Sequence, residues 1–323
     1  MNNQIDIKNL TIGYKEQAPL ITNQNLQLSQ GEFVALVGKN GSGKSSLLRT
    51  VANFQPLQKG QIFINNKKHE ELSTPDFAKL VSVVLTDKVV MGYTTVFDVV
   101  AAGRFPYLGL YGNLKEEDKS VVSKSLELVG MGKYANKPFD NLSDGQQQKV
   151  ILAKALAQET PYILLDEPMA FLDLPSKMEL SHILHDLAKN QGKGILISTH
   201  DLDLAIHTCD TMWLLSQQQV MVGMPEDLAL KGLLGEVFNT NKVSFNAKSG
   251  HFEFESKKEK QVKVINIESL DLFWLSKALH RNGYKVSSDA LITITKKENY
   301  WKIQHADKLV IANNLKELIA LLP

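Results

Sequence analysis

The chain has 323 residues, of which 43% are hydrophobic and 22% are charged, an ordinary globular composition that allows a sizeable core. Its formal net charge of +1 excludes the excess of basic residues that marks a general nucleic-acid binder. The single cysteine, Cys209, excludes an internal disulfide.

The N-terminal stretch MNNQIDIKNL has neither a basic leader nor an apolar core, so no signal peptide is expected. No apolar run approaches the roughly 18 residues that a membrane-spanning helix needs. We therefore expect a protein that is cytosolic or peripheral to a membrane.

Apolar runs alternate with helical segments over the first three quarters of the chain. Alternation from Ile5 to Ile12 predicts a strand, and residues 24–31 predict a second strand that ends in a turn. The continuous apolar run at 33–37 is typical of a strand buried on both faces. Further strands are predicted at 60–66, 161–166 and 194–199, and helices at 44–52, 116–130, 145–158 and 176–190. This alternation predicts an α/β fold with a largely parallel sheet.

The pattern changes near residue 246, where a smaller set of elements begins. The charged run at 256–261 is typical of a linker or an exposed strand edge. Beyond it we expect a strand at 262–267, a helix at 270–282, short strands within 284–304 and a helix at 314–322. The sequence therefore predicts a first domain at 1–247 and a small accessory α+β domain at 248–323.

A glycine-rich stretch, residues 38–45, reads GKNGSGKS between a predicted strand and a predicted helix. It matches the phosphate-loop pattern G-x-x-x-x-G-K-[ST]. Bare backbone N–H groups in such a loop cradle phosphate oxygens, and the helix N-terminus adds partial positive charge. Lys44 would reach the β- and γ-phosphates, and Ser45 would ligate Mg²⁺. The alternative is a flexible turn that matches by chance.

Two acidic residues, Asp166 and Glu167, follow the apolar run Ile163-Leu164-Leu165. An aspartate at the end of a buried strand can hold Mg²⁺ through water. The neighbouring glutamate would polarise the attacking water as a general base. The alternative is a pair of loop acids without a shared role, which the phosphate loop upstream disfavours.

Residues 141–148 read NLSDGQQQ and lie upstream of the acidic strand. With the two motifs above, they resemble the ATP-binding subunit of an ABC transporter, in which L-S-G-G-Q occupies this place. The resemblance implies a P-loop ATPase core with a helical subdomain at 1–247, and an ATP sandwiched in a head-to-tail dimer. Ser143, Gly145 and Gln146 would face the nucleotide of the other protomer. Asp144 departs from the usual glycine, and either weakens phosphate binding or serves as a first-turn acid of the helix.

The resemblance also assigns roles to single residues. Tyr14 would stack on adenine, the alternative being a core aromatic. His200 would contact the γ-phosphate and orient water, although a lone histidine after a strand is ordinarily structural. Leu172-Asp173 matches the loop that couples the two ATP sites. The catalytic set is Glu167, His200 and Lys44, and the ATP-binding set is Tyr14, Gly38, Asn40, Gly41, Ser42, Gly43, Lys44, Ser45, Ser46, Ser143, Gly145 and Gln146.

One residue of the family pattern, a glutamine that follows a strand, is absent. Val83-Val84-Leu85 leads instead to Thr86-Asp87, so Thr86 stands where that glutamine is expected. Its hydroxyl could still ligate Mg²⁺ beside Ser45 and Asp166. Asp87 is either a substitute ligand or a solvated loop acid.

The segment at 99–109, VVAAGRFPYLG, is similar to the G-R-x-P-y segment of subunits that import iron–siderophore complexes, haem or vitamin B12. In such subunits it lies near the groove that receives a helix of the membrane permease. Phe105 and Tyr107 would then be exposed for docking, or would be core residues of the helical subdomain. One phosphate loop and no coiled-coil insertion favour a separate importer subunit over a soluble ABC ATPase that acts on ribosomes or DNA.

These expectations together describe a homodimer that works with integral-membrane permease subunits and, through them, with a substrate-binding protein. It would bind no nucleic acid and would lie peripherally on the cytoplasmic face of the inner membrane. The accessory domain at 248–323 would either extend the dimer contact or pack on the core, or would hold a regulatory site.

Overall fold

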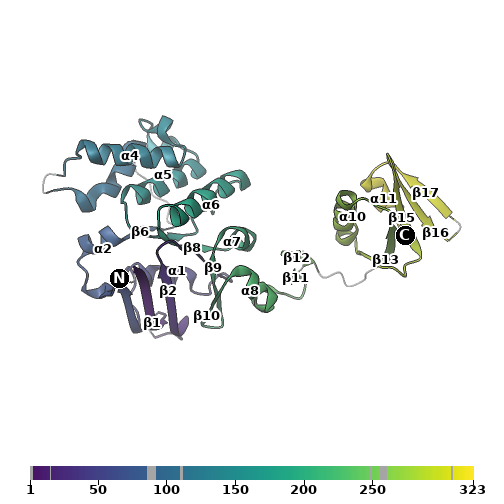
Figure 1. Cartoon of the computed structure of the whole chain (residues 1–323), viewed down its shortest axis with the longest axis horizontal. Helices are drawn as coiled ribbons and strands as arrows, with labels where there is room; N and C mark the ends of the chain where they lie inside the picture. Colours follow the sequence, from purple (N-terminus) through teal and green to yellow (C-terminus); the bar gives the residue numbers. More distant parts are fainter. Residues whose placement is uncertain are drawn as a thin grey trace. The chain divides into compact units, whose positions relative to one another are not determined.

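A computed structural model describes residues 3–14, 16–85, 92–109, 112–247, 249–254, 260–306 and 308–323. The chain folds as two compact units, Met1–Phe238 and Asn239–Pro323 (Figure 1). This division falls ahead of the boundary predicted after residue 247, so the assignment of the intervening residues stays a prediction.

A mixed six-stranded sheet forms the centre of the first unit, in the order β10-β9-β3-β8-β7-β6. Its strands are β3 (Phe33–Gly38), β6 (Val81–Val84), β7 (Tyr162–Asp166), β8 (Gly194–Thr199), β9 (Thr211–Ser216) and β10 (Gln219–Gly223). All neighbours are parallel except β9 and β10. Every residue of β3, β7 and β8 is buried, as continuous apolar runs predict. The predicted α/β fold with a largely parallel sheet is confirmed.

A second sheet of the first unit is antiparallel, in the order β2-β1-β4-β5. It consists of β1 (Gln4–Ile12), β2 (Ile21–Ser29), β4 (Lys59–Ile64) and β5 (Lys67–Lys68). Ile5, Ile7 and Leu28 of this sheet share one buried cluster with Leu36 and Trp213 of the central sheet. Burial of that cluster holds the two sheets together around the phosphate-loop helix.

Helices surround the central sheet and form a separate layer in which α4 and α5 lie together (Figure 1). Val96, Val122 and Val150 are fully buried where α3, α4 and α5 pack against one another. No helix in the described ranges is long and apolar enough to cross a membrane. The bounds are α1 (Lys44–Val51), α2 (Thr74–Leu80), α3 (Val96–Ala101), α4 (Glu116–Leu128), α5 (Asp144–Ala157), α6 (Leu174–Lys189), α7 (Leu202–Thr208), α8 (Pro225–Leu230) and α9 (Leu233–Phe238), with 3₁₀ turns η1 (His69–Glu71), η2 (Ala102–Tyr107), η3 (Gly132–Tyr134) and η4 (Phe139–Asn141).

The second unit is a small α+β fold with its own core. A five-stranded sheet in the order β14-β13-β15-β16-β17 packs with α10 and α11 around Val262, Leu275, Ile294 and Leu318. The predicted strand and two helices of this region are present. The bounds are β11 (Val243–Asn246), β12 (His251–Phe254), β13 (Lys260–Ile265), α10 (Ser269–Arg281), β14 (Tyr284–Val286), β15 (Ile292–Lys297), β16 (Tyr300–His305), β17 (Lys308–Ala312) and α11 (Leu315–Leu321).

Candidate active site

The candidate phosphate loop, residues 38–45, forms the turn between β3 and α1. Gly41 and Gly43 have φ angles of 76° and 108°, which residues with a Cβ rarely adopt. At Gly38, a Cβ would lie 2.8 Å from the carbonyl oxygen of Leu215. Two of these glycines are therefore required by backbone conformation and the third by lack of space.

Lys44 is buried at the first position of α1. Its Nζ donates to the carbonyl oxygens of Gly38 at 2.8 Å and Lys39 at 3.2 Å. Burial lowers the pKa of the Lys44 ammonium, and the charges of Glu167 and Asp166 oppose that shift. A desolvated cation that is bonded to neutral carbonyls gains by exchanging them for phosphate oxygens, because charge-assisted hydrogen bonds are the stronger ones.

The Ser42 hydroxyl is the clearest sign that the loop accommodates a ligand. Its oxygen is buried and has no hydrogen-bond partner among the residues that the structure describes. A buried hydroxyl left unpaired is costly, so a bound group with acceptor oxygens would relieve that cost. Asn40 and Gly41 beside it are exposed and line a pocket, which leaves the loop open to such a group.

Asp166 ends β7 and is 1% exposed. Its Oδ1 accepts hydrogen bonds from the hydroxyls of Ser45 at 3.0 Å and Ser198 at 2.5 Å. A carboxylate beside a serine hydroxyl is the hard-oxygen donor set that Mg²⁺ prefers. Within the described ranges, no group of three or more histidine, cysteine or acidic side chains could hold a metal ion by itself. An ion held by Ser45 and Asp166 would take its remaining oxygen ligands from water or from a bound phosphate.

Glu167 is held in an unusual backbone conformation, with φ of 48°. Its N–H donates to the Ser198 hydroxyl at 2.9 Å. Its carboxylate Oε2 lies 3.3 Å from Nδ1 of His200, which extends from the end of β8 and is 55% exposed. The left-handed conformation falls at the residue that follows β7, and the two side chains lie beside each other in a pocket that they both line.

Residues of the candidate phosphate loop line one pocket of about 620 Å³ together with Glu167 and His200. The structure thereby brings together most of the predicted ATP-binding and catalytic residues of the N-terminal and central motifs. Tyr14 is 52% exposed at the rim, with its hydroxyl 3.5 Å from Ser46 Oγ, so it is not a core aromatic. The lining residues are Tyr14, Leu20, Asn40, Gly41, Gly43, Lys44, Ser45, Ser46, Glu167 and His200.

Two residues of this region were not predicted. Leu20 lies against Gly43, where a Cβ would approach the Leu20 Cβ to 3.1 Å, and it forms an apolar wall near Tyr14. Ser198 pairs with Asp166 across the parallel strands β7 and β8 and joins the two acidic residues. Ser198 lies at the carboxyl end of its strand, two residues before His200, but only the order of the strands shows that it meets Asp166 at one edge of the sheet.

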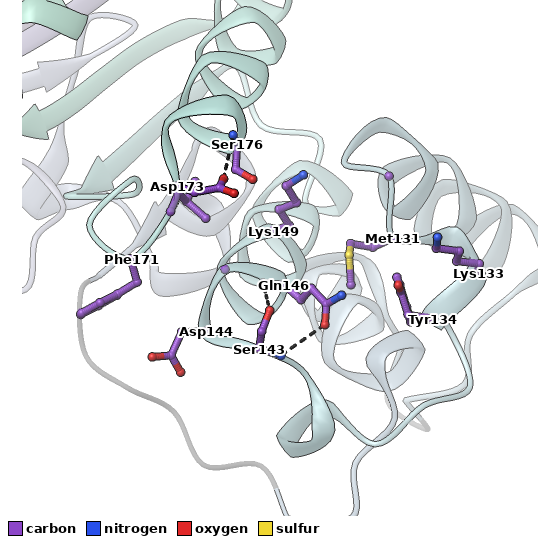
Figure 2. Close-up of a pocket in the computed structure, with 13 residues that line it drawn as sticks. Met131, Lys133, Tyr134, Ser143, Asp144, Gln146, Lys149, Phe171, Asp173 and Ser176 are labelled. Carbon is purple, nitrogen blue, oxygen red and sulfur yellow. Dashed lines mark hydrogen bonds between the residues drawn. The ribbon is translucent and has the colours of Figure 1, made fainter.

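The residues predicted to contact ATP from the other protomer line a different pocket of about 590 Å³ (Figure 2). Ser143 caps α5 by accepting the Gln146 N–H, while Gln146 Oε1 accepts the Ser143 N–H at 3.2 Å. Gly145 faces Leu172, and a Cβ there would lie 3.1 Å from Leu172 Cδ2. One copy of the chain therefore presents the phosphate loop and the Ser143–Gln146 turn in two separate pockets.

Acidic residues flank this second pocket. Figure 2 shows the Asp144 side chain extending to the opposite side of the turn from Gln146. Asp144 lies in the first turn of α5, where a negative carboxylate interacts favourably with the helix dipole and stabilises the helix. Asp173 caps α6 by accepting the Ser176 N–H at 3.0 Å, and hydrogen bonds from Ser176 hold the pKa of Asp173 below its usual value.

Two further predictions concern the region between the motifs. Thr86 and Asp87 lie outside the described residues, so their part in a metal site stays a prediction. Phe105 is 69% exposed and Tyr107 is 39% exposed, so the reading of Phe105 as a core residue is wrong.

The chain matches known protein families and relatives in sequence. The ABC transporter family model matches residues 21–170, and a model described as the iron ABC transporter C-terminal domain matches residues 258–323. An uncharacterised ABC transporter ATP-binding protein of Methanocaldococcus jannaschii is 37% identical over 80% of this chain and 90% of its own length. The iron(3+)-hydroxamate import ATP-binding protein FhuC of Bacillus subtilis is 34% identical, over 73% of this chain and 88% of its own.

The achromobactin transport ATP-binding protein CbrD of Dickeya dadantii is a further relative in sequence, 34% identical over 73% of this chain and 87% of its own.

Solved structures agree with the sequence comparison. The dimeric ABC transporter cassette MJ0796 superposes with a TM-score of 0.61 at 28% identity, covering 68% of this chain and 98% of that one. A structure described as a metal-chelate type ABC transporter in an inward-facing conformation gives a TM-score of 0.67 at 25% identity, covering 79% and 99%.

Proposed function

The chain belongs to the ABC transporter family as an ATP-hydrolysing importer subunit, and from this premise we propose that its cargo is a metal chelate of the iron–siderophore class. The named relatives FhuC and CbrD serve hydroxamate and achromobactin transport, and the segment at 99–109 points the same way. The match of residues 258–323 to an iron transporter domain adds support from the other end of the chain. Haem and cobalamin-type chelates are the alternative cargoes within the metal-chelate class.

The soluble alternative, an ABC ATPase that acts on ribosomes or nucleic acid, is not favoured. FhuC and CbrD are transport proteins, and each matches 73% of this chain. A net charge of +1 also provides little attraction for a polyanion.

One observation carries the proposal of a head-to-tail homodimer. Lys44 of the phosphate loop and Ser143 of the second motif line different pockets of the same copy. An ATP bound at the first pocket would therefore meet Ser143, Gly145 and Gln146 only from a second copy. Because each copy offers both pockets, the arrangement closes on itself with two-fold symmetry and two nucleotides.

The residues of the first pocket would divide the chemistry among them. Loop N–H groups and Lys44 would hold the phosphates and stabilise charge that develops on the transferring phosphoryl group. Glu167 would accept a proton from the attacking water while His200 orients that water and contacts the γ-phosphate. Mg²⁺, when bound, neutralises phosphate charge, and Ser45 and Asp166 would hold it, with Thr86 as a proposed third ligand.

The partners follow from the same premise. We infer that permease subunits dock near the exposed Phe105, and that a substrate-binding protein acts only through them. The subunit would then lie peripherally on the cytoplasmic face of the inner membrane. Residues 1–247 would form the ATPase domain, and residues 248–323 an accessory domain that supports the dimer.

Uptake in living cells tests the cargo and the partner class together. Source cells that lack this chain should lose ATP-dependent uptake of a radiolabelled ferric siderophore, and the wild-type chain should restore it. Glu71→Gln, which alters an exposed acid that lines neither pocket, should restore uptake equally well. Unchanged uptake of iron, haem and cobalamin in the deletion strain would contradict the proposal, and co-sedimentation of the chain with ribosomes in wild-type cells would favour the soluble alternative.

A further inference from the structure

The 3₁₀ turn η2 is packed closely against the C-terminal end of α5. A Cβ at Gly103 would overlap the carbonyl oxygen of Lys154, so η2 can approach α5 this closely only with glycine at that position. The methyl group of Ala157 lies close to the same point. This packing explains the glycine of the G-R-x-P segment as a contact between two elements.

Arg104, the next residue, joins three elements with one buried guanidinium group. It is 6% exposed. Its Nε donates to Asp118 Oδ1 of α4 at 2.9 Å, and its Nη1 donates to the Ala157 carbonyl at 2.8 Å and to Glu159 Oε2 at 2.7 Å. The cation therefore lies at the C-terminal end of α5, where its interaction with the helix dipole is favourable. It also binds Asp118 in the first turn of α4.

Tyr107 makes a second link between η2 and the same end of α5. Its ring lies over the Arg104 guanidinium, 4.3 Å from it, and its hydroxyl donates to the Gln158 carbonyl at 2.9 Å. Between these two anchored residues, Phe105 is 69% exposed. The turn thus presents one aromatic side chain outward while two neighbours grip the helix.

The other end of α5 carries the second pocket. Ser143 and Gln146 cap the N-terminal end of this helix, whose residues span about 21 Å at 1.5 Å per residue. Val150 and Ala153 are fully buried along its middle, which makes independent bending of the two ends unfavourable. A displacement of η2 would therefore move the Ser143 turn with it.

We propose that Arg104 is a positioning residue that couples the exposed surface at Phe105 to the Ser143 turn through α5. The inference rests on the proposed function, because it assigns the surface at Phe105 to the permease and the Ser143 turn to ATP. A bound permease would, through Arg104, set where that turn stands and hence how fast ATP is hydrolysed. Arg104 touches neither ATP nor permease in this account.

The test measures separately how well each variant binds the permease and how strongly the bound permease stimulates its ATP hydrolysis. The tagged wild-type chain and each variant are captured with the permease from detergent-solubilised membranes of source cells and reconstituted in vesicles. The rate of ATP hydrolysis per subunit is then measured for the free chain and for the permease complex. The rate in the complex divided by the rate of the free chain gives the stimulation. The variants are Arg104→Met, Arg104→Lys, Tyr107→Phe and Phe105→Ala. The control is Glu116→Gln, which breaks the exposed ion pair between Glu116 and Lys119 within α4.

Arg104→Met should still co-purify with the permease and keep the free hydrolysis rate within about twofold, yet lose stimulation about tenfold. Arg104→Lys should keep part of the stimulation, and Glu116→Gln all of it. Tyr107→Phe removes one hydrogen bond from a part-exposed side chain, so it should fold even if Arg104→Met does not. It should lose about twofold to threefold of the stimulation.

Three outcomes would overturn the inference. Full stimulation in Arg104→Met or in Tyr107→Phe would show that η2 does not transmit to α5. Loss of co-purification in Arg104→Met, equal to that in Phe105→Ala, would reduce Arg104 to a support of the docking surface. A wild-type chain that recovers no permease would instead refute the proposed function, and this inference with it.

Discussion

Ser45 Oγ lies 3.0 Å from Asp166 Oδ1, although the two residues are 121 positions apart in the chain. The contact forms because β3 and β7 both run parallel to β8, so that their carboxyl ends reach the same edge of the sheet. The phosphate loop that follows β3 and the acidic residues that follow β7 are thereby placed side by side. The rest of the proposed chemistry depends on this placement.

The first prediction concerns this pair. Asp166→Asn keeps the shape of the side chain but removes the charge proposed to hold Mg²⁺, so ATP hydrolysis should fall by about 100-fold or more. The Mg²⁺ concentration needed for half-maximal hydrolysis should rise. Steady-state hydrolysis over a Mg²⁺ titration measures both, with Asp76→Asn at the exposed start of α2 as a matched control. Unaltered Mg²⁺ dependence in Asp166→Asn would exclude this carboxylate from the metal site.

The second prediction concerns pH. Burial lowers the pKa of Lys44 below its usual 10.5, so the empty loop loses this cation at a lower pH than an exposed lysine would. Bound phosphate favours the charged form, which makes ATP affinity greatest below the lowered pKa and weaker as pH rises through it. Fluorescent-nucleotide titrations from pH 7 to alkaline pH should show this loss in wild type and not in Lys44→Ala. Parallel pH profiles for the two proteins would contradict the assignment.

The third prediction separates the two readings of Asp144. Because its side chain extends away from Gln146, Asp144→Asn should leave ATP hydrolysis within about threefold of wild type. The loss of a first-turn carboxylate should lower the free energy of unfolding by about 0.5 kcal/mol. Urea denaturation and steady-state hydrolysis measure the two effects. A large rise in ATP affinity without a change in stability would show instead that the carboxylate opposes phosphate binding.

The fourth prediction concerns Cys209, which is buried and whose thiol has its pKa raised to about 12 by that burial. A thiol with so high a pKa has almost no thiolate at pH 8, so a thiol reagent should label native Cys209 very slowly. Labelling should become complete when guanidinium unfolds the chain. Ser288→Cys places a second thiol at an exposed position and serves as the fast reference. Equal rates for both thiols in the native protein would show that Cys209 is accessible.

Local patterns in the sequence were enough to predict the buried strands β3, β7 and β8 of the central sheet and the loops that follow them, whereas β9 and β10 were not predicted. The apolar runs at 33–37, 161–166 and 194–199 are buried on both faces, so their composition alone marks them as parallel strands. Glycine at positions 41 and 43 is required by the local backbone, which is why a short motif could reveal the turn. These features depend on neighbours within a few residues, and the sequence displays them directly.

Features that depend on distant neighbours were missed. Leu20 reaches the pocket only because the antiparallel sheet brings it against Gly43, and no motif marks that contact. Ser198 acquires its role from strand order, which local pattern does not contain. The sequence does not decide whether Phe105 is exposed, because its burial depends on what packs around η2.

The central claim, that ATP is held between two copies of the chain, is tested most directly by the solution mass of Glu167→Gln with ATP and Mg²⁺. Slowed hydrolysis should trap the sandwich, so light scattering should give the mass of a dimer with two bound nucleotides, and a monomer without ATP. Adding Ser143→Arg, which blocks the second pocket and leaves the first intact, should return a monomer that still binds ATP. A nucleotide-saturated monomer of Glu167→Gln, or a dimer unaffected by Ser143→Arg, would contradict the account.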